Sequence, residues 1–167
     1  MKILTSHITD DKTFFDFTSK KGKLSIPELH DDVHVRVSAY RSGNNYNFSG
    51  KINTSFMLTC DRCLEDYSLD VDVDVDVIYS TAENAVKDEH LMPLSPYDIK
   101  IDLLPYIRET LVLSIPVKKL CSPDCKGLCP ICGTNLNHMD CSCKTENDDP
   151  RWDKLKELKK TLENAEE

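Results

Sequence analysis

The sequence predicts a β-rich α+β fold: an antiparallel sheet or a partly open barrel, a covering helix, a zinc-ribbon or knuckle module, and a terminal helix. Apolar and polar residues alternate over 33–40 and again over 69–77, and this period of two is typical of half-buried strands. Six of the eight cysteines lie between Cys121 and Cys143, which indicates a metal-binding module. We therefore expect a β-rich domain with its covering helix (1–116), a cysteine-rich zinc module (117–146) and an amphipathic helix (147–167).

The strand predicted at 33–40 is expected to lead into a β-hairpin. It is followed at 41–45 by glycine and asparagine, which tolerate the positive φ angles of tight turns. A second strand starts near Tyr46, returns along the first and reaches Cys60. Gly50 interrupts its pattern of side chains, so we expect a β-bulge or a crossing point there.

The strand at 69–77 alternates valine with aspartate, so it should present one apolar and one acidic face. The acidic residues are Asp70, Asp72, Asp74 and Asp76. Neighbouring carboxylates on one face of a strand lie roughly 7 Å apart, too far apart and too straight for one calcium ion. We interpret the row as the solvated face of an antiparallel sheet, with a dock for a basic partner as the alternative.

One helix is predicted between the strands and the cysteine cluster. Residues 80–97 show no periodicity and are expected to form a loop. Asp102 can cap a helix that starts at Leu103 and ends before Pro116. Its apolar stripe, which should cover the open face of the sheet, consists of Leu104, Ile107 and Leu111.

A second helix is predicted after Asp149-Pro150, a capping residue followed by a proline suited to the first helical position. It is amphipathic, with an apolar face of Trp152, Leu155, Leu158 and Leu162 and basic residues Lys154, Lys156, Lys159 and Lys160 elsewhere. The apolar face could pack on its own domain, or the helix could be presented to RNA or a protein partner.

The cysteines favour zinc in a reducing compartment. The chain starts without the apolar run of a signal peptide and has no stretch long enough for a membrane helix, so we expect a cytoplasmic protein with no membrane partner. Clustered thiols in that setting bind metals more often than they form disulfides. Another soft metal, an iron–sulfur cluster and disulfides are the alternatives.

Two complete sites account for all eight cysteines, because a structural zinc ion takes four ligands. The first predicted site consists of Cys129, Cys132, Cys141 and Cys143. The second consists of Cys60, Cys63, Cys121 and Cys125. Two zinc ions are expected, and Asn135 should organise the loop after the Cys129-Cys132 turn through bonds to the backbone.

Two alternatives compete with this assignment. His138 could replace one sulfur in either site. Cys60 and Cys63 could instead form a redox dithiol, although such motifs belong at a helix start and this stretch predicts hairpins. Four thiolates would leave no open position on the ion, and no other catalytic motif or small-molecule site is recognisable, so we predict no enzymatic activity.

The net negative charge of the chain limits how it could bind nucleic acid. The formal net charge is −8, and two sites of 2 − 4 = −2 each would take it to about −12. A protein this acidic does not bind RNA through general attraction to phosphates. Either a local basic strip or a protein partner must carry such a contact.

The run from Cys121 to Asn137, with Cys129-Pro130-Ile131-Cys132-Gly133 at its centre, resembles the YceD family of large ribosomal RNA subunit accumulation proteins. Supporting matches, in the family's order and spacing, are Cys60-Asp61-Arg62-Cys63-Leu64-Glu65, Ile101-Asp102-Leu103-Leu104, the Leu-Ser-Ile-Pro that ends at Pro116, and Asp149-Pro150-Arg151-Trp152. The resemblance spans roughly Gly50 to Lys160. It implies a bacterial or organellar factor for the synthesis, processing or stability of 23S ribosomal RNA in ribosome biogenesis, and it carries over no catalytic residues.

The leading hypothesis is therefore a non-enzymatic factor that binds ribosomal RNA. The candidate contacts are the basic residues near the cysteines and on the last helix: Arg62, Lys118, Lys119, Lys126, Lys154, Lys156, Lys159 and Lys160. The runner-up is a protein-only adaptor that docks on a ribosomal protein or a ribonuclease. A thiol oxidoreductase is the third hypothesis.

Overall fold

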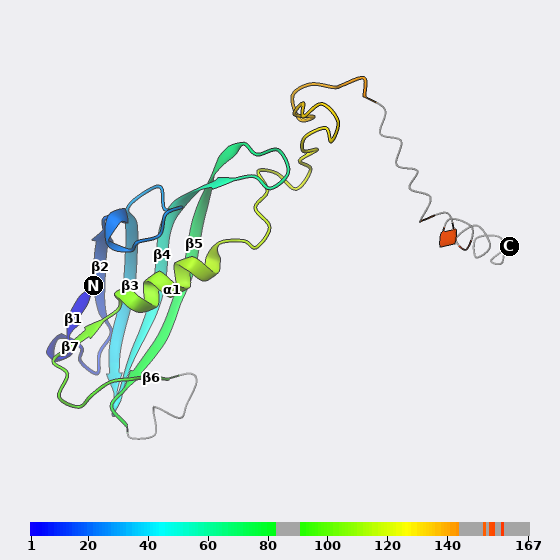
Figure 1. The fold of residues 1–167 in the computed structure, drawn as a ribbon. Coiled ribbons are helices and arrows are strands. Elements are labelled where there is room, and N and C mark those ends of the chain that lie inside the picture. Colours follow the sequence, from blue (N-terminus) through cyan, green and yellow to red (C-terminus); the bar gives the residue numbers. More distant parts are fainter. Residues whose placement is uncertain (83–90, 144–151, 153, 156–157, 159–167) are drawn as a thin grey trace.

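A computed structural model describes residues 1–82, 91–143, 152, 154, 155 and 158. Its strands form a five-stranded sheet and a separate two-stranded pair (Figure 1). In spatial order the larger sheet contains β2 (Thr13–Ser19), β3 (Val33–Ser42), β4 (Asn45–Thr59), β5 (Asp66–Ser80) and β6 (Leu91–Pro93). The helices η1 (Thr5–His7), η2 (Lys21–Lys23) and α1 (Leu104–Ser114) and the paired strands β1 (Lys2–Leu4) and β7 (Lys100–Asp102) complete the elements. The larger sheet is open, with β2 and β6 as its edges, and is not a closed barrel.

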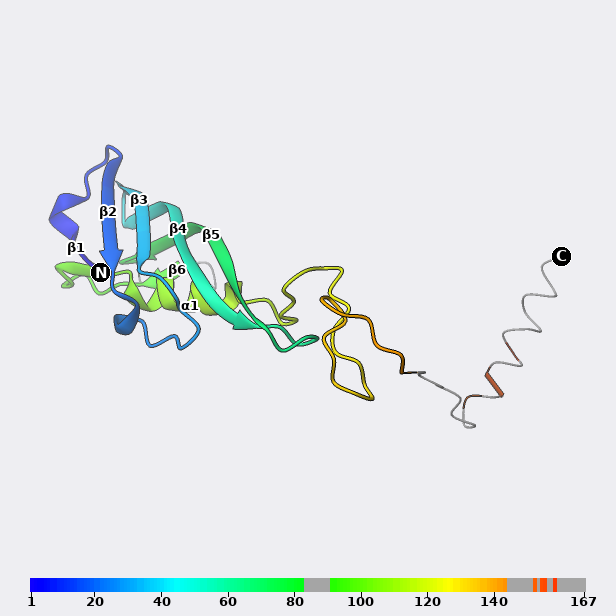
Figure 2. The ribbon, with the colours of Figure 1, turned by 90° about the horizontal axis from the view of Figure 1, so that it is seen from above.

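The predicted hairpins are confirmed. β3 turns into β4 through Gly43 and Asn44, and Gly43 supplies the positive φ of 59° that the turn needs. β4 and β5 have 15 residues each and pair antiparallel from Asn45 with Ser80 to Thr59 with Asp66. At about 3.4 Å per residue this hairpin is roughly 50 Å long. Its closed end projects beyond the rest of the sheet to the cysteine-rich segment (Figures 1 and 2).

The two faces of the sheet differ as the alternation predicted. On β5 the aspartates are exposed, whereas Val75 and Val77 are buried. Helix α1 lies across the apolar face and buries Ile107 and Leu111 against it (Figure 1). The side chain of Tyr106 fixes the helix to the strand, because its hydroxyl donates to the Asp76 carbonyl at 3.1 Å. The covering helix is therefore confirmed.

Asp102 stabilises the start of α1, although the helix begins one residue later than predicted. Its Oδ1 accepts the N–H of Leu104 at 3.1 Å and the amino group of Met1 at 2.9 Å. Burial alone would raise the pKa of this carboxyl, but the ammonium group and the N–H outweigh burial and lower it. The charged carboxylate thus joins β1, β7 and α1.

The β-bulge expected at Gly50 is absent, and the structure shows instead a close approach between the backbones of β3 and β4. Pairing continues without a gap on both sides of Gly50, which lies opposite Val37 on β3 and Val75 on β5. A Cβ atom at this position would lie 2.0 Å from the Arg36 carbonyl oxygen. Glycine is required here because the backbone of β3 occupies the space of a side chain.

Other elements differ from the sequence prediction. The segment 80–97, expected to be a loop, contains β6, which pairs parallel to β5. Strands β1 and β2 were not predicted. The terminal helix lies mostly outside the described residues, within which Lys154, Leu155 and Leu158 have helical backbone. Among the helices of the described residues, none has the length and apolar character needed to cross a membrane.

Candidate metal centre

The turn that closes the β4–β5 hairpin carries Cys60 and Cys63. The N–H of Cys60 donates to the Glu65 carbonyl and the N–H of Leu64 donates to the Cys60 carbonyl, both at 2.9 Å. The N–H of Arg62 approaches Cys60 Sγ at 3.5 Å. Leu64, the residue after the second cysteine, has a φ of 60°.

A second turn with the same hydrogen bonds carries Cys129 and Cys132. Here the N–H of Cys129 donates to the Thr134 carbonyl at 2.8 Å, and the N–H of Gly133 donates to the Cys129 carbonyl at 2.9 Å. Gly133 has a φ of 72°. Counted from the first cysteine, donors, acceptors and the positive φ fall at the same positions in both turns. We call them the two knuckles; they differ in that one is closed by glycine and the other by leucine.

This difference predicts opposite responses to substitution. Gly133→Ala should lower the free energy of unfolding of the metal-loaded protein by about 1 kcal/mol, because a Cβ atom is disfavoured at positive φ. Leu64→Gly should raise the free energy of unfolding, because the exposed leucine already bears the cost of a Cβ atom at positive φ. Urea titration measures both. Leu64→Ala, which keeps the Cβ atom, is the control; equal effects of Leu64→Ala and Leu64→Gly would contradict the conformational explanation.

Each knuckle meets two further cysteines. The Sγ atoms of Cys60, Cys63, Cys121 and Cys125, which we call the tip quartet, all lie within 4.8 Å of one another. The same limit holds for the ribbon quartet, which consists of Cys129, Cys132, Cys141 and Cys143. These are the two groups that the spacing predicted, and each could hold a metal ion; that they do so stays a prediction. All eight cysteines are free thiols.

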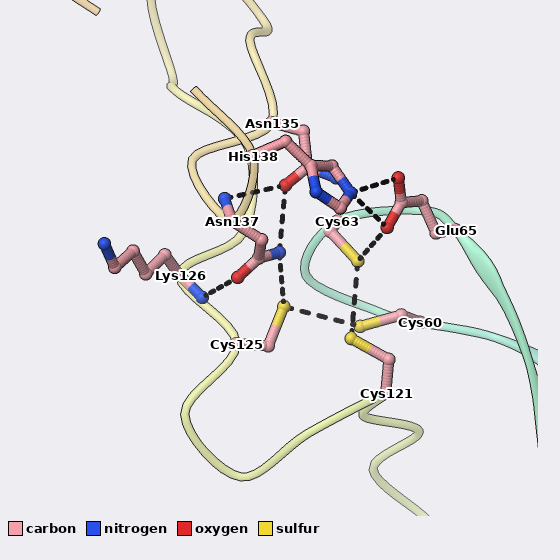
Figure 3. A network of polar contacts seen from close by, with 9 residues as sticks. All are labelled: Cys60, Cys63, Glu65, Cys121, Cys125, Lys126, Asn135, Asn137 and His138. Carbon is pink, nitrogen blue, oxygen red and sulfur yellow. Dashed lines mark hydrogen bonds and ion pairs between the residues drawn. The ribbon is translucent and has the colours of Figure 1, made fainter. Parts of the chain in front are cut away.

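The geometry of the tip quartet fits a tetrahedral ion (Figure 3). The Sγ atoms of Cys60 and Cys125 are 3.8 Å apart, and those of Cys63 and Cys121 are 3.6 Å apart. Four sulfurs at metal–sulfur distances of about 2.3 Å in a tetrahedron are roughly 3.8 Å from one another. Cys60, Cys63 and Cys125 are buried and Cys121 is exposed, so the ion would be shielded on most sides.

The thiols of each quartet differ in acidity. Burial raises the pKa of Cys60, but surrounding backbone N–H groups outweigh it and lower the pKa to about 6. Burial, followed by the neighbouring thiols, raises the pKa of Cys121 to about 12. In the ribbon quartet, bonds to Thr134 lower the pKa of Cys132 to about 6, and contact with Cys132 raises the pKa of Cys143 to about 12. Four thiols this close resist joint ionisation, a repulsion that a divalent cation would remove.

Bonds from the first knuckle hold the segment that brings in Cys121 and Cys125. The N–H of Asp61 donates to the Lys119 carbonyl at 2.8 Å, and Asp61 Oδ2 accepts the N–H of Lys119 at 2.7 Å. The Arg62 guanidinium donates to the Cys125 carbonyl at 2.8 Å. Arg62, predicted to contact RNA or a partner, therefore also has an internal role.

The loop of the ribbon quartet reaches back to the tip quartet through Asn137, which the sequence analysis missed. Its Nδ2 donates to Cys125 Sγ at 3.2 Å, and its Oδ1 accepts the N–H of Lys126 at 2.8 Å (Figure 3). Asn135 organises this loop as expected, because its Oδ1 accepts the backbone N–H of Asn137 at 2.9 Å. The only available signal was a second asparagine two residues after Asn135.

His138 does not join either quartet. Its Nε2 lies 2.9 Å from Glu65 Oε1, and its side chain is exposed. The Glu65 carboxylate in turn approaches Cys63 Sγ at 3.9 Å. The alternative in which His138 replaces a sulfur is therefore not supported, and the histidine instead links the ribbon loop to the first knuckle.

The other predicted contact residues are lysines on the cysteine-rich segment and on the terminal helix. Lys118 and Lys126 are exposed and Lys119 is half-buried. Lys154 is exposed, while Lys156, Lys159 and Lys160 lie outside the described residues. Their contact with RNA or a partner stays a prediction.

A β-rich domain whose longest hairpin carries two cysteines of one four-cysteine group, with a second such group close in sequence, defines the class: a β-rich protein with a cysteine module that could bind metal. The family model described as "Large ribosomal RNA subunit accumulation protein YceD" matches residues 48–159. That range covers β4 from Phe48 onward, β5, α1 and all eight cysteines. The chain belongs to the YceD family.

The chain is also similar to curated proteins, one of which bears the family's name. A chloroplastic YCED homolog 1 of Arabidopsis thaliana, named a large ribosomal RNA subunit accumulation protein, is 26% identical over 163 residues, which cover 80% of this chain and 50% of the relative. An uncharacterized protein of Mycobacterium tuberculosis is 30% identical over 129 residues, 76% of this chain and 61% of the relative. The chain thus spans only about half to three fifths of these relatives. No solved structure is significantly similar to it.

Proposed function

We propose that the chain is a non-enzymatic, zinc-binding factor that supports the synthesis, processing or stability of large-subunit (23S) ribosomal RNA during ribosome biogenesis. The observation that carries this proposal is the family match over residues 48–159, which includes both quartets. The family is described by the accumulation of the large ribosomal RNA subunit. Depletion of the protein in its own cells should therefore lower the ratio of large-subunit to small-subunit ribosomal RNA, and an unchanged ratio would contradict the proposal.

Zinc is the metal that fits the quartets best. Four thiolates in a tetrahedron are typical of structural zinc sites, and the sulfur spacing of the tip quartet agrees with zinc–sulfur distances. We expect two zinc ions per chain, measured by elemental analysis together with thiol titration of protein purified under reducing conditions. Iron with acid-labile sulfide would instead indicate a cluster, and one ion would leave only one quartet as a site.

The metal module is the part we propose to make the recognition contact. Because the whole chain is acidic, attraction to phosphates has to be local. Lys118 and Lys126 are exposed on the segment that holds the cysteines, and the basic residues of the terminal helix follow along the chain. The quartets would keep this short segment in a defined shape, which its few apolar residues could not do alone.

Direct RNA binding gives a testable salt dependence. Filter binding of ribosomal RNA fragments should weaken as salt rises, and Lys126→Glu with Lys118→Glu should lower both the affinity and the slope of log K against log salt, by roughly one unit per lost phosphate contact. Lys12→Glu with Lys20→Glu makes the same charge change at two exposed positions outside the module and should have little effect. No binding at low salt would exclude direct RNA contact.

A protein-only adaptor is the second candidate, and the acidic face of β5 favours it. Asp70, Asp72, Asp74 and Asp76 are all exposed, and only Lys51 among the described residues forms ion pairs with this row. Such a face suits a basic ribosomal protein or a ribonuclease. Affinity capture after nuclease treatment separates the candidates: partners retained without RNA favour the adaptor.

We propose a cytoplasmic setting, where thiols stay reduced and available to a metal.

A thiol oxidoreductase would need free access to Cys60 and Cys63, yet both are buried within the tip quartet. It would also reduce insulin disulfides in a standard assay, and we expect no such activity. Insulin reduction with loss of metal from the tip quartet would overturn the non-enzymatic proposal.

A further inference from the structure

The two quartets share one continuous piece of chain. Cys125 belongs to the tip quartet and Cys129 to the ribbon quartet, and only three residues separate them. Gly127, in the middle, has a φ of 77°, and a Cβ atom there would lie 3.0 Å from the Arg62 carbonyl oxygen. The N–H of Leu128 donates to that same oxygen at 3.1 Å. The first knuckle therefore packs directly against the link between the quartets.

The loop between Cys132 and Cys141 crosses back over this link. The N–H of Leu136 donates to the Gly127 carbonyl at 2.9 Å, next to the Asn137 contact with Cys125. Metal binding by the ribbon quartet would fix both ends of this loop. The loop would then carry its side chains onto the tip quartet.

The orientation of the Asn137 amide is determined by its partners. Its Oδ1 must face the N–H of Lys126, because a backbone N–H can only donate. Its Nδ2 therefore points the other way, with one hydrogen for Asn135 Oδ1 at 2.9 Å and one for Cys125 Sγ at 3.2 Å. Both amide hydrogens are used, so the donor to sulfur is held in place (Figure 3).

A donor at this position matters because four thiolates and one divalent ion have a net charge of 2 − 4 = −2. Hydrogen bonds to the sulfurs offset part of this charge. Residues that contact the ligands of a metal in this way typically change its affinity by roughly 10- to 100-fold when they are replaced.

We infer that the two metal sites are coupled, with Asn137 as the positioning residue through which a filled ribbon quartet strengthens metal binding at the tip quartet. The inference rests on the metal binding proposed above. Coupling runs in both directions by thermodynamic linkage, so a filled tip quartet also strengthens the ribbon quartet. The contact between His138 and Glu65 adds a second connection between the same loop and the first knuckle.

The test follows zinc release from each quartet separately in the full chain. Zinc-loaded protein is challenged with a chelator, exposed thiols are alkylated over time, and tryptic peptides are analysed by mass spectrometry. Cleavage after Lys126 separates Cys125 from Cys129, so the two quartets can be distinguished. Asn137→Ala should speed release from the tip quartet by roughly 10- to 100-fold.

Two further variants make the result decisive. Met139→Ala, an exposed neighbour in the same loop, is the matched control and should release zinc like the wild type. The double variant Cys141→Ser/Cys143→Ser empties the ribbon quartet and should speed release from the tip quartet to a similar degree. Adding Asn137→Ala to this double variant should then change little, because both act through the same contact.

The outcomes separate the inference from the proposal on which it rests. Wild-type protein that retains no zinc would refute metal binding itself. If two ions bind but Asn137→Ala releases them as the wild type does, the positioning role is refuted. A full additional effect of Asn137→Ala on release from the tip quartet of the Cys141→Ser/Cys143→Ser variant would refute the coupling.

Discussion

Replacing Cys63 with serine is expected to abolish metal binding at the tip quartet and to lower the free energy of unfolding of the loaded protein by about 4 kcal/mol. Cys63 and Cys121 are 58 residues apart in sequence, and their sulfurs are 3.6 Å apart. A cross-link that closes a loop of this length restricts the unfolded chain by about 4 kcal/mol. Urea titration and elemental analysis measure the two effects.

Cys132→Ser is the matched control for this result. It removes one ligand from the ribbon quartet, whose members all lie within residues 129–143 and outside the sheet. It should lose one metal ion and destabilise the β-sheet domain clearly less than Cys63→Ser does, because the tip quartet keeps its four ligands and is only weakened. Chelation of the wild type should reproduce the loss of stability in Cys63→Ser. The explanation fails if Cys63→Ser and Cys132→Ser destabilise the sheet equally.

Gly50→Ala is the substitution with the next largest expected effect. The new Cβ atom would lie 2.0 Å from the Arg36 carbonyl oxygen and 2.7 Å from Val37 Cα, both of them backbone atoms of β3. Relief requires β3 and β4 to separate in the middle of the sheet. We expect a loss of about 3 kcal/mol or more, a large part of the stability of a typical domain.

A glycine with space around it provides the control for that prediction. At Gly22, in η2, a Cβ atom would meet nothing within 4 Å, so Gly22→Ala should change stability by less than about 1 kcal/mol. Chemical denaturation followed by circular dichroism compares the two variants. Similar midpoints for Gly50→Ala and the wild type would show that β3 and β4 adapt without cost.

The local patterns were sufficient for the hairpins, the helix and the partition of the cysteines. The alternation over 69–77 predicts both faces of β5 correctly because side chains in a strand alternate between faces. The quartets follow from a count of four ligands per ion and from two CxxC turns that need separate partners. The hairpins and the helix depend on residues that are close in sequence, and the quartets depend on the number of ligands that a metal ion takes.

The missed features depend on tertiary contacts. β6 has three residues and pairs parallel to β5, a contact that no short-range pattern encodes. The close approach at Gly50 depends on how closely β3 packs beside β4. Asn137 acts through a hydrogen bond to the sulfur of a cysteine 12 residues away in sequence. The residues next to Asn137 in sequence do not indicate that partner.

The repetitive sequence of β5 allows more than one alignment, and the knuckle at the end of the hairpin removes this freedom. Because valine and aspartate repeat every second residue, β5 could slide by two positions along β4 and still keep its valines on the core side. Such a shift would pull Cys63 away from Cys60 and disrupt the turn that closes the hairpin. An ion held at that turn would therefore favour the native register of β4 and β5 during refolding. Chains refolded without metal should contain hairpins in which the two strands are misaligned.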